Sequence, residues 1–231
     1  MRFLRTLLLG LFVVTVVPVA GLREWSPPFT AFMLHARIQA WMDGDEDFRL
    51  RQHWVPFAAI APEAALAVVA AEDQWFNRHF GFDLNAMEQA LRHNEAGGKI
   101  RGASTLSQQT AKNLFLYPGK SYIRKALEAW FTVLLELMLP KQRILEIYLN
   151  IAQFGLGIYG VEAASQHFFH KQAASLTSAE AALLAAVLPN PIRLRVDQPT
   201  PYLLGRQAWI LRQMKQLGGT TYLQDIRASA G

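Results

Sequence analysis

Two glutamates, Glu72 and Glu128, flank a stretch of the chain that contains no acidic residue. Six basic residues lie between positions 96 and 127: Lys99, Arg101, Lys112, Lys120, Arg124 and Lys125. The whole chain has a formal charge of +5 and this stretch alone has +6, so the positive charge is local. Carboxyl groups act as general acids and bases, and clustered cations attract anions. The pattern predicts proton transfer beside an anionic group, for which phosphate is the best candidate.

Glu72 follows the apolar run 64–71 and is itself followed by Asp73, Trp75 and Phe76. A carboxyl group pressed against apolar and aromatic side chains has a raised pKa, which suits a general acid or base. The alternative interpretation is a solvated helix end, which is the more common outcome for a Glu-Asp pair taken alone.

The segment 102–113 has the composition of a ligand-binding helix. At about 100° per residue, four polar side chains fall within one sector of that helix: Ser104, Thr105, Gln108 and Lys112. Hydroxyl, amide and ammonium groups suit a ligand with sugar hydroxyls and a phosphate, and the helix N-terminus attracts anions. The alternative is an ordinary surface helix.

Glu128 has Arg124 four residues and Lys125 three residues before it, so all three share one face of a helix expected over 121–139. The alternative is a plain intrahelical salt bridge, which contributes little. On a buried helix, the cluster could hold a carboxylate beside phosphate or bind a divalent ion. We expect this helix to be central, because its other sides are apolar and include a stripe of Ile123, Ala126, Trp130, Leu134 and Leu137.

The composition excludes several classes of chemistry. The chain has 231 residues, enough for one domain with a full core, and 52% of them are hydrophobic. Cysteine is absent, so disulfides, thiol catalysis and cysteine zinc sites are excluded. The six histidines show no tight metal-ligand spacing apart from His167 and His170, which we place on an exposed helix face.

The N-terminus has the pattern of a membrane anchor. Arg2 and Arg5 precede an uncharged run over 6–22, which is 17 residues long and at the short edge of what spans a bilayer. Basic residues ahead of the run place the N-terminus in the cytoplasm. The alternative is a cleaved signal peptide, to which Pro18 fits poorly. Under both interpretations, the rest of the chain lies outside the cytoplasm.

Helix signals dominate the rest of the chain, and alternating strand patterns are almost absent. Proline and capping residues predict helix starts near Pro62, Asp83, Thr105, Ser121, Pro140, Thr177 and Thr200. We expect a short strand within 50–55, a mobile break over 94–102, and a last helix that ends at Gly218-Gly219. The predicted divisions are an anchor over 1–24, a connector over 25–54, a catalytic domain over 55–218 and a tail over 219–231.

Five segments, in order and with matching spacing over roughly 55–215, resemble the motifs of the peptidoglycan glycosyltransferase family. They are Glu72-Asp-x-x-Phe76-x-x-His79-x-Gly81, Gly102-x-Ser104-Thr105-x-x-Gln108-Gln109-x-x-Lys112-Asn113, Arg124-Lys125-x-x-Glu128, Ile144-Leu145-Glu146-Ile147-Tyr148-Leu149-Asn150 with Phe154-Gly155, and Leu176-Thr177-x-x-Glu180 with the apolar residues after it. Ala103 stands where the family often has glycine. No transpeptidase segment follows, so the chain resembles the monofunctional biosynthetic members.

The resemblance implies a mainly α fold, with a lysozyme-like lobe and a smaller membrane-proximal lobe, preceded by one N-terminal transmembrane helix. It also implies polymerisation of glycan strands. The growing strand on undecaprenyl pyrophosphate is the donor, and the 4-hydroxyl of lipid II attacks its anomeric carbon. A β-1,4 bond forms with inversion, and undecaprenyl pyrophosphate leaves.

By motif position, Glu72 is the expected general base and Glu128 lies on the pyrophosphate side. The expected phosphate-binding cations are Lys112, Lys120, Arg124 and Lys125. The residues expected to position substrate or shape the cleft are Ser104, Thr105, Gln108, Gln109 and Asn113. Asp73 and His79 are expected to order the loop after Glu72. No cofactor is required, although Glu128 could bind Mg²⁺ or Mn²⁺.

The expected partners are lipid II, the nascent strand, the membrane and other cell-wall synthesis or division proteins, with no nucleic acid. The expected location is the inner membrane, as a single-pass protein whose catalytic domain lies on the periplasmic side. Two rival functions stay open. A lysozyme-like hydrolase or lytic enzyme would need no phosphate-binding cations, and a non-catalytic membrane-anchored scaffold would not need Glu72, Glu128 and Lys112 together.

Overall fold

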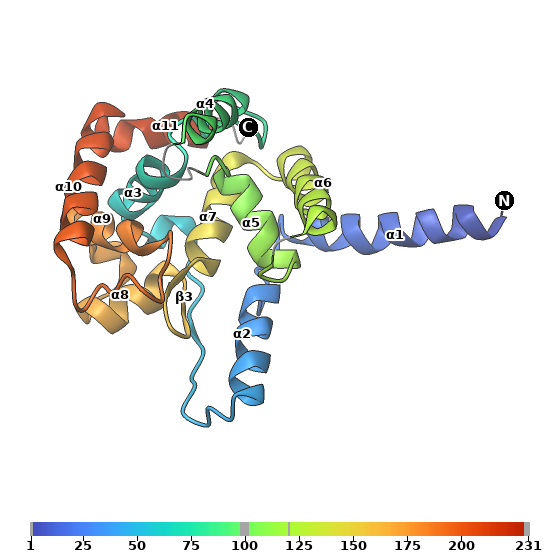
Figure 1. The fold of residues 1–231 in the computed structure, drawn as a ribbon, viewed down its shortest axis with the longest axis horizontal. Coiled ribbons are helices and arrows are strands. Elements are labelled where there is room, and N and C mark those ends of the chain that lie inside the picture. Colours follow the sequence, from blue (N-terminus) through green and yellow to red (C-terminus); the bar gives the residue numbers. More distant parts are fainter. Residues whose placement is uncertain (1, 98–101, 120, 229–231) are drawn as a thin grey trace.

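The computed structural model describes residues 2–97, 102–119 and 121–228. Within these residues the chain forms eleven α-helices and three short strands, so the predicted mainly α fold is confirmed (Figure 1). The helices are α1 Arg2–Gly21, α2 Ala31–Met42, α3 Pro62–Glu72, α4 Leu84–Glu95, α5 Leu106–Phe115, α6 Tyr122–Met138, α7 Lys141–Ile151, α8 Val161–Phe169, α9 Ser178–Val187, α10 Pro201–Gln216 and α11 Tyr222–Ala228. The strands are β1 Arg51–Gln52, β2 Gln153–Gly155 and β3 Ile158–Tyr159.

The helices begin where the local capping signals predict. Asp83, Ser121 and Thr200 each accept a backbone N–H of the first turn of α4, α6 and α10. Thr105 and Thr177 form complete capping boxes at the starts of α5 and α9. These bonds satisfy N–H groups that a helix N-terminus leaves unpaired, so they set where each helix starts.

Helix α3 is the centre of the core and ends at the proposed catalytic glutamate. Its residues 64–70 are all buried, and it packs against α9 and α10. A helix that is apolar on every side must be enclosed, which explains this position. Because the buried helix cannot shift easily, it holds Glu72 firmly at its last turn.

Helix α6 differs from the prediction. It lies at the surface, where it packs against α5 and α1, rather than at the centre of the fold. Ile123, Trp130 and Leu137 of the predicted core stripe are exposed. The buried face instead carries the polar residues Glu128 and Thr132, together with two leucines and Glu136. The expectation of a central helix was wrong because a helix with apolar residues on several sides does not reveal which side is buried.

The three strands form a small sheet in the order β1-β3-β2, with β1 parallel and β2 antiparallel to β3. The strand predicted within 50–55 is therefore confirmed, although it has only two residues. Gly157, in the turn before β3, has φ +68°, and a Cβ there would lie 2.4 Å from the carbonyl oxygen of Arg49. Only glycine allows this close approach.

The N-terminal helix α1 projects away from the body of the protein (Figure 1). The C-terminal part of α1 and the residues after it are held by the domain: Val19 and Leu22 are buried, and Arg143 of α7 donates to the carbonyl oxygens of Leu22 at 2.8 Å and Trp25 at 3.1 Å. Among the described residues, no helix combines the length and apolar character needed to cross a membrane. The transmembrane anchor therefore stays a prediction.

The C-terminal residues add structure that the sequence did not predict. Helix α10 ends at Gln216, close to the predicted stop at Gly218. The chain then forms α11, whose Leu223 and Ile226 are buried, so the predicted tail packs onto the domain. Residues 98–101 of the predicted mobile break over 94–102, which include Lys99 and Arg101, lie outside the described residues, and so does Lys120.

Candidate active site

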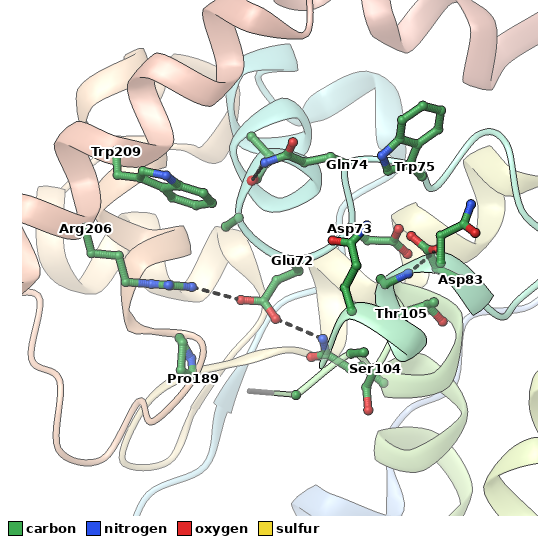
Figure 2. Close-up of a pocket in the computed structure, with 18 of the residues that line it drawn as sticks. Glu72, Asp73, Gln74, Trp75, Asp83, Ser104, Thr105, Pro189, Arg206 and Trp209 are labelled. Carbon is green, nitrogen blue, oxygen red and sulfur yellow. Dashed lines mark hydrogen bonds and ion pairs between the residues drawn. The ribbon is translucent and has the colours of Figure 1, made fainter. Parts of the chain in front are cut away.

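A cleft of about 1360 Å³ opens where α3 ends and α5 begins. Helices α4 and α10 supply its other walls (Figure 2). Its lining residues include Glu72, Trp75, Ser104, Gln109, Arg206 and Trp209. Indole rings beside carboxyl, amide and guanidinium groups make a surface with both apolar faces and hydrogen-bonding edges, which suits a carbohydrate.

Glu72 lies in this cleft with both carboxylate oxygens engaged. Its Oε2 accepts a hydrogen bond from Gln109 Nε2 at 2.9 Å, and its Oε1 lies 3.4 Å from a terminal nitrogen of Arg206 (Figure 2). Burial raises the pKa of Glu72 above its ordinary value, while the Gln109 hydrogen bond and the charges of Arg206 and Lys112 partly oppose that rise. The carboxylate is therefore more basic than a solvated glutamate and stays oriented by two donors.

Asp73 and His79 tie the loop after α3 to the start of α5. Asp73 Oδ2 accepts the backbone N–H of Leu106 at 2.9 Å, and its two oxygens lie 2.9 and 3.0 Å from His79 Nε2. Thr105 Oγ1 donates to the carbonyl oxygen of Gly81 at 2.6 Å. Because these bonds lock two segments together, they fix Glu72 opposite Gln109. The geometry supports the predicted ordering role of Asp73 and His79.

Two residues of the predicted polar face of α5, Thr105 and Gln108, are buried, and of these two only Thr105 lines the cleft. Gln108 is 3% exposed, and its Oε1 accepts the backbone N–H of Thr105 at 3.0 Å to complete the capping box. Its neighbour Gln109 is the amide that reaches Glu72. Ser104 is exposed and lines the cleft. Thr105 and Gln108 are therefore placed to shape the cleft, and Ser104 and Gln109 are placed to meet a ligand.

Replacing Thr105 with valine should lower both stability and activity. The change removes the bond to Gly81 and the cap of α5, and we expect the free energy of unfolding to fall by about 2 kcal/mol. Because the start of α5 would shift, Gln109 would no longer be held in place beside Glu72, and kcat/KM should fall at least about tenfold. Urea unfolding and glycan polymerisation assays measure the two effects.

Thr177→Val is the matched control, because it breaks the equivalent capping box of α9. It should cost about 1 kcal/mol of stability and leave kcat/KM within about twofold of the unaltered protein. Equal losses of activity in the two variants would contradict a positioning role for Thr105.

Glu128 forms a second carboxylate centre on α6. The residue is 2% exposed, and it accepts hydrogen bonds from Arg124 at 2.7 Å and from Lys125 Nζ. The Lys125 side chain is 48% exposed, whereas that of Arg124 is 12% exposed and its buried Nε has no hydrogen-bond partner within the described residues. A buried carboxylate that holds two cations gives an anion-binding surface a fixed shape.

Lys112 of α5 interacts electrostatically with both carboxylate centres. Burial lowers the pKa of Lys112, the charges of Arg124 and Lys125 lower it further, and both Glu128 and Glu72 oppose the change. Lys112 is therefore near enough to both glutamates to sense their charge. Its Nζ also lies 5.6 Å from the centre of the Phe32 ring of α2. Asn113 follows it on α5 and is half-buried.

The structure places the predicted site residues in two groups: Glu72, Asp73, Ser104, Thr105 and Gln109 line the cleft, whereas Arg124, Lys125 and Glu128 form a cluster on α6 that does not line it. Lys120 lies outside the described residues. The structure also adds Arg206, which comes from α10, 134 residues after Glu72. An isolated arginine on an amphipathic helix carries no sequence signal for a site. Tyr148 is a second addition: its segment resembles a family motif, but that resemblance assigns it no role. Its hydroxyl donates to Gln109 Oε1 at 3.1 Å.

Comparison with known proteins agrees with this geometry. The family model described as Transglycosylase matches residues 41–215. A biosynthetic peptidoglycan transglycosylase of Klebsiella oxytoca is 56% identical over 224 residues, covering 96% of this chain and 93% of the relative. One from Yersinia pseudotuberculosis serotype O:3 (strain YPIII) is 57% identical over 199 residues, covering 86% and 83%. The chain therefore belongs to the transglycosylase family.

Proposed function

We propose that the protein polymerises peptidoglycan glycan strands from lipid II. The observation that carries the proposal is a cleft that holds the buried carboxylate of Glu72, together with a second buried carboxylate, Glu128, that holds two cations; the charges of both carboxylates act on Lys112. A glycosyl transfer with a pyrophosphate leaving group needs a base at the attacking hydroxyl and positive charge at the departing oxygen. The names of the relatives support the same reaction.

In the proposed reaction, Glu72 removes the proton from the 4-hydroxyl of the incoming lipid II. That oxygen attacks the anomeric carbon of the growing strand, a β-1,4 bond forms with inversion, and the bond to undecaprenyl pyrophosphate breaks. Lys112, Arg124 and Lys125 stabilise the negative charge that grows on the leaving group. Lys120 is assigned the same task from its motif position. Ser104, Gln109 and Asn113 orient the substrates.

A divalent cation, Mg²⁺ or Mn²⁺, stays a prediction for which Glu128 is the candidate ligand. No group of three or more His, Asp or Glu side chains suited to a metal ion occurs among the described residues. Glu128 would therefore supply one carboxylate and the substrate phosphates the other oxygens, as is usual for Mg²⁺. An ion there would compete with Arg124 and Lys125 for the same two oxygens.

We further propose that α1 anchors the protein in the inner membrane and that the domain lies on the periplasmic side. Two features support a membrane-proximal position for α6: it packs against α1, and it exposes Tyr122, Ile123 and Leu137. Large exposed apolar side chains beside an anchor suit contact with lipid. Other cell-wall synthesis or division proteins stay predicted partners.

Product analysis separates this function from its two rivals. The protein is incubated with purified lipid II, or with preformed glycan strands, and the products are resolved by size. The proposal predicts polymer and released undecaprenyl pyrophosphate from lipid II, and intact preformed strands. Cleaved strands would indicate a hydrolase, for which the cations around Glu128 would have no purpose. Unchanged lipid II and unchanged strands would indicate a scaffold.

The rate of polymerisation should show a bell-shaped dependence on pH. Glu72 must be ionised to act as a base, and burial raises its pKa, so the acid limb of kcat/KM should lie above that of an ordinary glutamate. Lys112 must be protonated to bind phosphate, and burial lowers its pKa, so the alkaline limb should lie below that of an ordinary lysine. Initial rates with lipid II across the pH range check both limbs, and an acid limb at an ordinary glutamate pKa would contradict the assignment.

A further inference from the structure

Tyr148 is a buried tyrosine that reaches the catalytic cleft only through another side chain. It lies in α7 and is 1% exposed, and its ring does not line the cleft. Its hydroxyl donates to Gln109 Oε1 at 3.1 Å, and Gln109 Nε2 donates to Glu72 Oε2 at 2.9 Å. We propose that Tyr148 is a positioning residue for Glu72, which acts by fixing the orientation of the Gln109 amide. This inference rests on the proposed role of Glu72 as base.

The two ends of the Gln109 amide differ in their hydrogen bonding. One end accepts hydrogen bonds and the other donates them, yet both have nearly the same shape, so the neighbours decide which way the amide points. An ionised Glu72 can only accept, and it therefore needs the NH₂ end. The opposite end then needs a donor, and the Tyr148 hydroxyl is the donor that the structure provides. A phenol hydroxyl can also accept a hydrogen bond, but a reversed amide would turn its NH₂ end to Tyr148 and deprive the buried phenol proton of its acceptor, Gln109 Oε1.

The proton of Tyr148 is permanently available for this bond. Burial raises the pKa of the phenol well above its ordinary value, and the negative charge of Glu72 raises it further. The phenol therefore stays protonated wherever the enzyme works. Gln109 itself sits on α5, whose start is fixed by its capping box and by Asp73. The hydrogen bonds therefore run in one direction, from the Tyr148 hydroxyl to the Gln109 amide and from that amide to the Glu72 carboxylate.

A reversed amide would change the protonation of Glu72. It would place Gln109 Oε1 against the carboxylate, where two acceptors repel unless Glu72 takes up a proton. In that state Glu72 could not remove a proton from a sugar hydroxyl. By disfavouring the reversed amide, Tyr148 keeps the base ionised at a lower pH than burial alone would allow.

The test is the pH profile of kcat/KM for the full-length Tyr148→Phe variant with purified lipid II. Phenylalanine preserves the buried ring and removes only the donor. We expect the acid limb to move to higher pH, with kcat/KM about tenfold below that of the unaltered protein at the acid end and within about threefold on the plateau. An acid limb in the same place as in the unaltered protein would overturn the inference.

Tyr159→Phe is the matched control. Tyr159 is also a buried tyrosine, at 2% exposed with its pKa raised to about 12 by burial, but it lies in β3 and does not line the cleft. Its loss should leave the acid limb in place. An equal displacement in both variants would show a general effect of losing a buried hydroxyl and would overturn the inference.

Gln109→Met gives an independent test, which also serves if Tyr148→Phe proves unstable in thermal unfolding. It should displace the acid limb in the same direction, and the double variant should show no further displacement, because Tyr148 acts through Gln109. Additive displacements would overturn the inference. A Glu72→Gln variant separates a failure of this inference from a failure of the proposed function. If Glu72→Gln is inactive while Tyr148→Phe has the acid limb of the unaltered protein, only the positioning role of Tyr148 is wrong. If Glu72→Gln is fully active, the proposed role of Glu72 as base is wrong as well.

Discussion

Replacement of Glu72 by glutamine is expected to lower kcat for glycan polymerisation by about 10²- to 10⁴-fold, because the change removes the proposed general base. Glutamine has the same shape and still reaches Gln109 and Arg206, so the fold should persist. The loss should lie in kcat rather than KM, since the base acts mainly in the transition state. Steady-state rates of polymer formation measure it.

Glu63→Gln is the control for this variant. Glu63 lies in the first turn of the same helix, at the end away from the cleft, and it is half-buried. Its replacement should leave kcat within about twofold and cost at most about 1 kcal/mol of stability, through the lost interaction with the helix dipole. If Glu72→Gln retained more than about a tenth of the activity, another group would have to be the base.

Replacement of Lys112 by methionine should have the second-largest effect. Methionine keeps most of the length of the side chain and removes a charge that interacts with both Glu72 and Glu128. Because the charge of the leaving pyrophosphate grows as its bond breaks, we expect kcat/KM to fall by about 10²- to 10³-fold. The loss should appear partly in KM, since the ground state also carries negative phosphates. Initial rates over a range of lipid II concentrations separate the two parts.

Lys215→Met is the control for the loss of one cation. Lys215 is exposed in the last turn of α10 and does not line the cleft. Its replacement changes the net charge by the same amount and should leave kcat/KM within about twofold. Equal losses at the two positions would mean that Lys112 contributes only to long-range attraction of the substrate.

Features that depend on a few neighbouring residues could be predicted from the sequence. The helix starts at Asp83, Thr105, Ser121, Thr177 and Thr200 were predicted correctly, because a cap bonds to N–H groups only two or three residues away. The pairing of Glu128 with Arg124 and Lys125 was also predicted, since i−4 and i−3 spacings on a helix fix the geometry.

Features that depend on tertiary packing could not be predicted. The wrong choice of buried face on α6 arose because Glu128 and Thr132 lie inside, while Ile123 and Leu137 face outward. The same limit applies to α5, where adjacent glutamines have different tasks. The structure shows that Gln108 is buried in the capping box, whereas Gln109 lines the cleft and bonds Glu72.

Contacts between residues far apart in the sequence could not be predicted either. Arg206 meets Glu72 only because α10 packs against α3, and Tyr148 meets Gln109 only because α7 packs against α5. Neither contact follows from spacing or composition. The rise in the pKa of Glu72 was predicted from its apolar neighbours, and burial is its main cause, but these polar neighbours became visible only in three dimensions.

The central claim is that Glu72 performs chemistry and does not merely bind substrate. A single-turnover experiment with excess protein over labelled lipid II tests it most directly, when paired with a measured Kd for lipid II. For Glu72→Gln, we predict a Kd within about threefold of the unaltered protein and no formation of the first β-1,4 bond on the timescale of the unaltered protein. Bond formation at the unaltered rate would contradict the claim.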